Sequence, residues 1–139
     1  MGRTIVEHVR GMLFEGVGSS GHTVRTDANR EVGGEDSAAR PVETLLCALG
    51  GCTGMDVVSV LRKMKTEPTG LRIEIDDERA ETYPKVLTKL HLTYIIEGDV
   101  PEKNVAKAID LSLEKYCPIA SSLAGVADIT SEFRIVSTH

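Results

Sequence analysis

Apolar and polar residues alternate in short runs at the start of the chain. Residues 4–18 contain two such runs, separated at Gly11, and residues 21–27 follow a Gly-Ser-Ser-Gly turn. Short runs bounded by glycine are typical of strands that pair with their neighbours in sequence. We therefore predict a meander of three N-terminal strands, followed by a polar loop over residues 28–40.

A helical pattern begins at Pro41, a favourable first residue of a helix. Apolar residues then recur at spacings of three and four over about 25 residues. These positions are Val42, Leu45, Leu46, Leu49, Val57, Val60, Leu61 and Met64. The middle of this helix is apolar on nearly all sides. We therefore expect that other elements bury the helix and that it does not lie on the surface.

Strands and helices alternate in the second half of the chain. Residues 71–76 and 86–98 show the period of two that is typical of half-buried strands, and we expect them to pair antiparallel. A helix over residues 101–117 ends before Pro118, since a residue that precedes proline is disfavoured in the helical region. Further helical turns follow to Gly125, and residues 128–137 form a last strand.

The predicted order, βββ-α-ββ-α-β, indicates an α+β fold in a single domain, residues 1–139. A net charge of −5 offers no basic surface to nucleic acid. The longest uncharged run, residues 44–55, is about half the ~20 residues of a membrane span. With no signal-peptide pattern at the start, we expect a cytoplasmic protein that has neither nucleic acid nor membrane as a partner.

Three cysteines are the candidates for chemistry. Five residues separate Cys47 from Cys52, which places them about 140° apart around a helix, so they cannot pair with each other. Cys47 is best interpreted as a core residue. The glycines around Cys52 (Gly50, Gly51 and Gly54) weaken the helix, and indicate either close approach of a backbone or ligand, or tight helix packing. Cys117 either ends a helix or caps the next one, where free N–H groups favour a negative charge.

Other polar residues give weaker signals. Glu43 lies in the first helical turn, where it either complements the helix dipole or pairs with a buried arginine. Asp56 would repel a thiolate at Cys52 and is expected to cap a neighbouring backbone. The sequence contains no Cys-x-x-Cys, His-x-x-x-His or nucleotide-binding glycine motif, so we expect no metal site and no cofactor.

Taken together, these motifs resemble the OsmC/Ohr family of osmotically inducible and organic-hydroperoxide-resistance proteins, especially its YhfA-like branch. The resemblance rests on the Gly-His-x-x-x-x-Asp strand, the paired glycines before the helix, the Pro-x-Glu helix start, the helical cysteine and the later Cys-Pro. It extends over nearly the whole chain. It implies an intertwined homodimer in which antiparallel sheets from both chains pack around two long central helices, with the active sites at the interface.

The resemblance also assigns roles to residues. It implies that Cys52 is the peroxidatic cysteine, that Cys117 is the resolving cysteine, and that Glu43 orients an arginine. The Cys52 thiolate would reduce an organic hydroperoxide to an alcohol, and Cys117 would convert the resulting sulfenic acid into a disulfide. A dithiol reductant, in this family a lipoyl group, would restore the thiols. We therefore expect a cysteine-based peroxidase that acts in antioxidant defence under oxidative stress.

One position departs from the family pattern. Organic-hydroperoxide-resistance members carry an arginine just before the strand that matches residues 21–27, where this chain has Ser19 and Ser20. Arg25 or Arg40 could replace that arginine beside Cys52. Without an activating arginine, the alternative is a protein of the same fold that binds apolar ligands or senses oxidants without catalysis.

Overall fold

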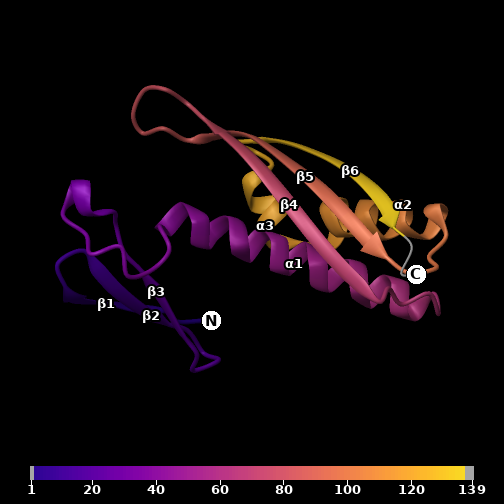
Figure 1. Ribbon diagram of the computed structural model, residues 1–139, viewed down its shortest axis with the longest axis horizontal. Coiled ribbons are helices and arrows are strands. Elements are labelled where there is room, and N and C mark those ends of the chain that lie inside the picture. Colours follow the sequence, from indigo (N-terminus) through magenta and orange to yellow (C-terminus); the bar gives the residue numbers. More distant parts are fainter. Residues whose placement is uncertain (1, 137–139) are drawn as a thin grey trace. The chain divides into compact units, whose positions relative to one another are not determined.

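The computed structural model describes residues 2–136 and divides the chain into two compact units, Met1–Cys47 and Ala48–His139 (Figure 1). The order of the elements is the predicted one, with two short helical turns added. An α+β fold is thus confirmed. The assignment of residues 1–139 to a single domain stays a prediction, and the two units are described separately below.

The N-terminal unit contains the predicted meander. Strands β1 (Ile5–Arg10), β2 (Leu13–Val17) and β3 (Thr23–Thr26) form an antiparallel sheet in the order β1-β2-β3. Gly11 lies in the turn between the first two strands with φ +52°, a conformation that disfavours residues with a side chain. Every residue of β1 is exposed in the single chain, so this sheet leaves much of its surface uncovered.

Asp27 organises the loop that leads to the long helix. Its carboxylate accepts hydrogen bonds from the hydroxyl of Ser37 at 2.7 Å and from the backbone N–H groups of Ala28, Glu35 and Ser37 at 2.7, 3.3 and 3.1 Å. A one-turn helix, η1 (Arg30–Val32), lies inside the loop. The chain folds back so tightly here that a Cβ at Gly34 would lie 1.9 Å from the carbonyl oxygen of Ala28.

The long helix α1 extends over Pro41–Lys63, and its start at Pro41 is confirmed. In the single chain only one stripe, formed by Leu49, Thr53, Val57 and Leu61, is buried. Met55 is 74% exposed, and Cys47, which was expected in the core, is exposed as well. The sequence pattern could not separate faces covered by this chain from faces left open, because the apolar residues surround the helix.

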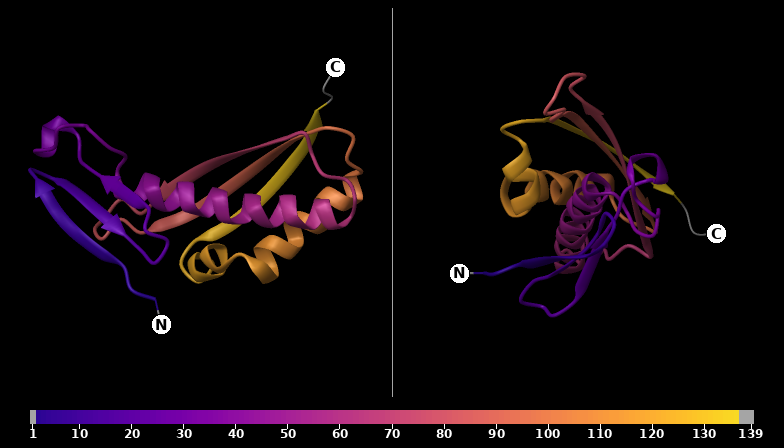
Figure 2. Two further views of the ribbon diagram at one scale, coloured as in Figure 1. Left: turned by 90° about the horizontal axis from the view of Figure 1, so that it is seen from below. Right: turned by 90° about the vertical axis from the view of Figure 1, so that its left-hand side faces the viewer.

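The C-terminal unit is a three-stranded sheet with helices on one face, which Figures 1 and 2 show from three directions. Strands β4 (Gly70–Arg79) and β5 (Leu87–Glu97) pair antiparallel, as predicted. Strand β6 (Asp128–Val136) pairs parallel with β5, so this sheet is mixed rather than antiparallel throughout. The parallel pairing follows from the helical crossover between β5 and β6. The last residue of the predicted strand, Ser137, lies outside the described residues.

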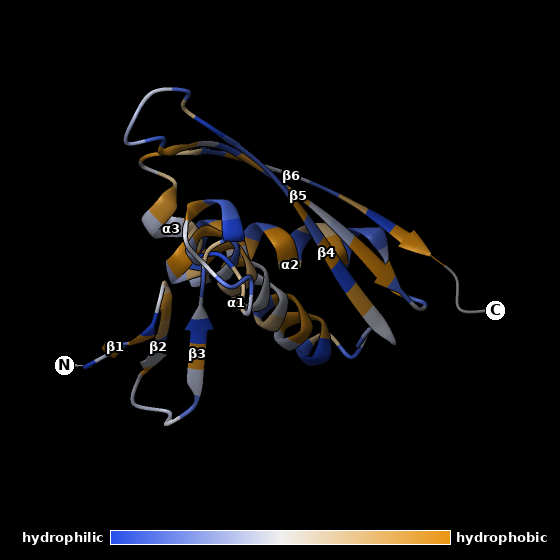
Figure 3. Ribbon diagram, turned by 60° about the vertical axis from the view of Figure 1, so that its left-hand side comes forward, coloured by the Kyte–Doolittle hydropathy of each residue, from blue (hydrophilic) through white to orange (hydrophobic). Residues whose placement is uncertain are grey.

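The sheet buries the face that its sequence period predicts. Apolar and polar residues alternate along its strands (Figure 3), and on β5 the alternation buries a complete row. This row consists of Leu90, Leu92, Tyr94 and Ile96. Residues 48–63 of α1 pack under the sheet, together with α2 (Glu102–Leu111) and α3 (Pro118–Leu123).

The helix predicted over residues 101–117 is not regular to its end. After α2, the chain widens into a π-helical turn, η2 (Ser112–Tyr116), closed by a hydrogen bond of 2.8 Å from the N–H of Cys117 to the carbonyl of Ser112. Cys117 then becomes extended, with ψ 105°, as expected for a residue before proline. Such π-turns are frequent at functional sites.

Two of the three glycines in α1 allow close packing against β4. A Cβ at Gly50 would lie 3.3 Å from the side chain of Ile75, and one at Gly54 would lie 3.2 Å from that of Ile73. Tight packing of α1 against β4 therefore explains Gly50 and Gly54. The approach of a partner helix is not needed to explain these two glycines. Gly51 has no such neighbour within 4 Å.

By length and hydropathy, α1 is the one helix among the described residues that could cross a membrane. The core helix of a soluble protein passes the same test. In the single chain, four residues of α1 form a buried stripe and 22% of the apolar window is buried. The absence of a membrane partner stays a prediction.

We predict that Asp27→Asn destabilises the protein in a pH-dependent way. Hydrogen bonds from Ser37 and Ala28 lower the pKa of Asp27 from 3.8 to about 2. A carboxylate with a depressed pKa stabilises the fold above the unfolded-state value, and this contribution is lost as the pH falls toward 2. Denaturant unfolding of both proteins between pH 2 and 7 should give a difference in the free energy of unfolding that is constant above about pH 5 and shrinks below pH 4. A difference independent of pH would contradict this role.

Candidate active site

The two cysteines that the resemblance selects meet in the C-terminal unit. Cys52 comes from α1, and Cys117 lies between η2 and α3, 65 residues later in the sequence. Their sulfur atoms and a carboxylate oxygen of Asp56 all lie within 4.8 Å of one another. Cys52 is half-buried, whereas Cys117 is fully buried. One cluster of two thiols and a carboxylate is thus assembled from two segments of the chain.

Local geometry explains why these three groups converge. Cys52 and Asp56 are separated by one helical turn, so their side chains lie on neighbouring points of the same face of α1. The extended conformation of Cys117 turns the chain between η2 and α3. Pro118 is tolerated directly after it, because the first residue of a helix needs no N–H partner.

Cys117 caps α3, as one of the two sequence alternatives proposed. Its sulfur accepts a hydrogen bond of 3.4 Å from the N–H of Ala120. The expected stabilisation of a thiolate is nevertheless outweighed. Burial raises the pKa of the Cys117 thiol, the neighbouring Cys52 raises it further, and the N–H groups of Ala120 and Ile119 oppose them. Cys117 therefore favours the neutral thiol.

A chain of buried hydroxyl groups ends at Asp56. The Thr53 hydroxyl lies 2.8 Å from that of Tyr94 and 2.7 Å from that of Ser112, and Ser112 donates to Asp56 at 2.9 Å. Each hydroxyl has one proton, so Tyr94 donates to Thr53 and Thr53 donates to Ser112. Burial raises the pKa of Tyr94 to about 12, and a protonated phenol is what the chain requires.

These hydroxyl residues were missed by sequence reasoning. Asp56 was expected to cap a backbone, but it accepts from the side chain of Ser112. A signal was present: Thr53 interrupts the apolar stripe of α1, and Ser112 interrupts that of the following helix. A buried polar residue on an apolar stripe needs a hydrogen-bond partner, and the sequence alone does not identify it.

The other predicted site residues have partners inside the N-terminal unit. Arg25 forms an ion pair with Glu15, and Arg40 forms one with Asp36 at 2.7 Å. Glu43 accepts a hydrogen bond of 3.0 Å from the backbone N–H of Arg40, which fits its alternative role at the start of the helix. The assignment of Glu43, Arg25 and Arg40 to the site of Cys52 stays a prediction.

Within the described residues, the same cluster is the one place where three metal-ligating side chains converge. Sequence reasoning predicted no metal site, because Cys52, Asp56 and Cys117 match no familiar ligand spacing. Two thiols and one carboxylate nevertheless offer three donor atoms, and residues 52 and 117 are brought together only by the fold. The donor set is compatible with both redox chemistry and metal binding.

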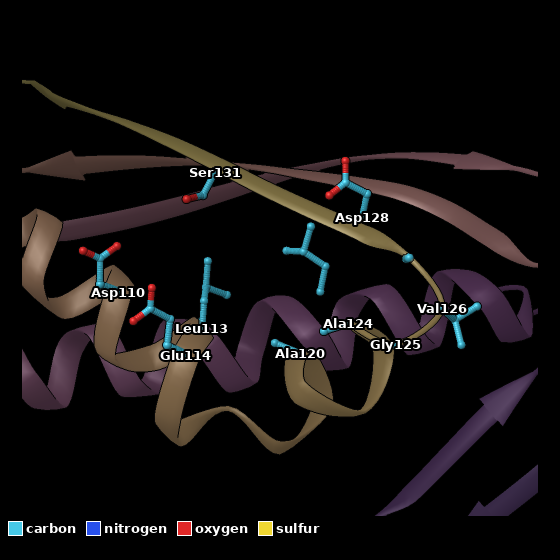
Figure 4. A pocket seen from close by; sticks show the side chains of 11 residues that line it. Asp110, Leu113, Glu114, Ala120, Ala124, Gly125, Val126, Asp128 and Ser131 are labelled. Atoms are coloured by element: carbon cyan, nitrogen blue, oxygen red, sulfur yellow. The ribbon is translucent and has the colours of Figure 1, made fainter.

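A separate open depression of about 640 Å³ lies between the helices and the start of β6 (Figure 4). Asp110, Glu114, Asp128 and Ser131 contribute polar atoms to it, and Leu113 contributes apolar surface. No cysteine lines it. Three carboxylates make it unsuited to anionic compounds such as fatty acids.

Comparison with known proteins agrees with the fold. The family described as OsmC-like protein matches residues 34–132. The chain is 37% identical to Protein YhfA of Escherichia coli strain K12 over 133 residues, which cover 95% of this chain and 96% of that protein. The crystal structure of a hypothetical protein from Aquifex aeolicus VF5 is similar, with a TM-score of 0.87 at 24% identity. That similarity covers 100% of this chain and 98% of the Aquifex chain.

An organic hydroperoxide resistance protein OsmC from Legionella pneumophila has the same fold, with a TM-score of 0.70 at 17% identity. That similarity covers 94% of this chain and 96% of the Legionella chain. The family model spans most of the sequence, and the match to YhfA spans nearly all of it. The resemblance inferred from the cysteine and glycine motifs is confirmed: the chain belongs to the OsmC-like protein family.

Proposed function

We propose that this protein reduces organic hydroperoxides, with Cys52 as the peroxidatic and Cys117 as the resolving cysteine. The observation that carries the proposal is the approach of the two sulfur atoms to within 4.8 Å of each other. Membership of the OsmC-like family supports it, as does the name of the Legionella protein as an organic hydroperoxide resistance protein.

Accessibility supports the assignment of the two roles. The half-buried Cys52 can meet a hydroperoxide, whereas the fully buried Cys117 cannot be reached without movement of the protein. The Cys52 thiolate attacks the terminal oxygen of ROOH, the O–O bond breaks, and the alkoxide leaves as ROH after taking up a proton. Cys52 is then a sulfenic acid.

Resolution needs no large displacement of the two sulfurs. The Cys117 sulfur attacks the Cys52 sulfenic acid, an S–S bond forms, and the hydroxyl group leaves as water. Because the pKa of Cys117 is raised, its thiol must lose a proton during this attack. The Asp56 carboxylate lies within 4.8 Å and can accept that proton. A dithiol, by family resemblance of the lipoyl type, then reduces the disulfide and is itself oxidised.

The first step needs a cation. A carboxylate repels a thiolate, and Asp56 lies close to Cys52. A guanidinium group would offset this repulsion and also polarise the hydroperoxide. We assign this role to Arg25 or Arg40, oriented by Glu43, since Ser19 and Ser20 occupy the position of the family arginine.

A homodimer forms part of the proposal. Ile5, Val6 and Val9 of β1 are 47%, 62% and 41% exposed in the single chain, and Met55 of α1 is 74% exposed. Within each unit taken by itself, exposed apolar residues of this kind are typical of a surface that another protein covers. Gly51, which has open space around it, lies one turn from Met55 and would allow a second helix to approach.

A second candidate function is oxidant sensing without turnover, which the same pair of sulfurs would support. A sensor would form the disulfide once and would not be reset rapidly by a dithiol. A third, binding of apolar ligands without catalysis, would leave both thiols reduced in the presence of hydroperoxide. The following experiment separates all three.

We predict that Cys52→Ser lowers steady-state reduction of cumene hydroperoxide with dihydrolipoamide on the order of 100-fold or more, because no sulfenic acid can form. Cys117→Ser should still release about one equivalent of alcohol per chain and then stop or turn over slowly. Both rates are measured by quantifying the alcohol produced in a quenched time course.

The matched control is Cys47→Ser, which removes an exposed thiol outside the cluster and should leave the rate unchanged. Equal rates for wild type and Cys52→Ser would refute the peroxidase proposal. A wild type that releases only one equivalent of alcohol would favour the sensor, and release of none would favour the binding protein.

We also predict that Met55→Glu weakens the homodimer, because it places a charge on the proposed helix interface. Sedimentation velocity at micromolar protein concentration should show a dimer for the wild type and a larger monomer fraction for the variant. Val126→Glu changes a residue that is 61% exposed on the C-terminal unit and serves as the control. A monomeric wild type, or equal effects of both substitutions, would contradict the proposed interface.

A further inference from the structure

We propose that the reduced cluster of Cys52, Asp56 and Cys117 is a binding site for a zinc ion. It offers two thiolate sulfurs and one carboxylate oxygen, all within 4.8 Å of one another. Thiolates favour Zn²⁺ over Mg²⁺ or Ca²⁺, which bind oxygen ligands. The site requires only the reduced sulfurs, and it stands whether or not the peroxidase cycle operates.

Distances support a tetrahedral site. Zinc–sulfur bonds of about 2.3 Å and zinc–oxygen bonds of about 2.1 Å place tetrahedral donor atoms about 3.6 to 3.8 Å apart. The three donors are at most 4.8 Å apart, so they need to close by about 1 Å or less around the ion. Rotation of side chains can supply this change, and a water molecule can occupy the fourth position, as in other zinc sites with three protein ligands.

Neighbouring hydrogen bonds would hold the ligands in place. Ser112 donates to one carboxylate oxygen of Asp56 at 2.9 Å, and the hydroxyl chain through Thr53 to Tyr94 fixes Ser112 in turn. The N–H of Ala120 donates to the Cys117 sulfur at 3.4 Å. Ligands of zinc are commonly oriented by such outer hydrogen bonds.

Charge also favours a cation at this position. A bound Zn²⁺ would replace the protons of the two thiols and neutralise most of the charge that the thiolates and Asp56 would otherwise bring together.

Zinc binding and disulfide formation exclude each other. The sulfurs are about 3.8 Å apart around a zinc ion but about 2.05 Å apart in a disulfide. When an organic hydroperoxide oxidises the pair, two electrons pass from the sulfurs to the O–O bond, the ligands lose their negative charge, and Zn²⁺ leaves without a change in oxidation state. Bound zinc would in turn protect the thiols from oxidation.

The test uses the full-length, fully reduced protein under anaerobic conditions. Zn²⁺ is titrated in competition with a chromophoric chelator, and Co²⁺ is titrated separately to detect the thiolate-to-cobalt charge-transfer band. We expect one tightly bound ion per chain in the wild type and in Cys47→Ser. Ser112→Ala, which removes a hydrogen bond to a ligand, should weaken binding about 10- to 100-fold. Cys52→Ser and Cys117→Ser should weaken it more and abolish or strongly reduce the cobalt band.

A second measurement on the wild type avoids dependence on the folding of variants. Alkylation followed by peptide mass spectrometry should show that Zn²⁺ protects Cys52 but leaves the exposed Cys47 reactive. Binding that survives both cysteine substitutions, protection of Cys47 instead of Cys52, or equal affinity of the disulfide form would overturn the proposal. None of these readouts measures turnover of hydroperoxide. A negative result would therefore refute the zinc site without refuting the peroxidase proposal.

Discussion

The hydrogen-bond chain from Tyr94 through Thr53 and Ser112 to Asp56 joins strand β5, helix α1 and the π-turn η2 at one buried point. A buried hydroxyl that loses its partner costs about 1–3 kcal/mol, so the chain strongly favours a single arrangement of these elements. That arrangement fixes the position of α1 relative to the turn before α3. It therefore also fixes the distance between Cys52 and Cys117. The cluster of Cys52, Asp56 and Cys117 thus depends on a hydrogen-bond network that contains no sulfur.

The fold could largely be predicted because its elements show clear periods in the sequence. The burial of the even positions of β5, from Leu90 to Ile96, followed from alternation alone. The parallel pairing of β6 and the widened turn at Ser112 could not be predicted, since both depend on how distant segments pack. For α1, the pattern correctly indicated several apolar faces, but it could not show that this chain itself buries only one of them.

The site was predictable only in part. Resemblance to a family selected Cys52 and Cys117, and the fold brings them together although 65 positions separate them. Asp56 was discounted because a carboxylate repels a thiolate, yet it lies in the cluster and is held there by Ser112. Sequence distance hides such a contact, because a serine on an apolar stripe identifies a buried polar site but not its partner.

Disulfide mapping can show whether Cys52 and Cys117 act as one redox pair. Reduced protein is treated with one equivalent of an alkyl hydroperoxide, the remaining thiols are alkylated, and the peptides are identified by mass spectrometry. We expect one disulfide per chain between Cys52 and Cys117, with Cys47 alkylated. A disulfide that involves Cys47, or a Cys52 oxidised to sulfinic acid while Cys117 remains a free thiol, would contradict it.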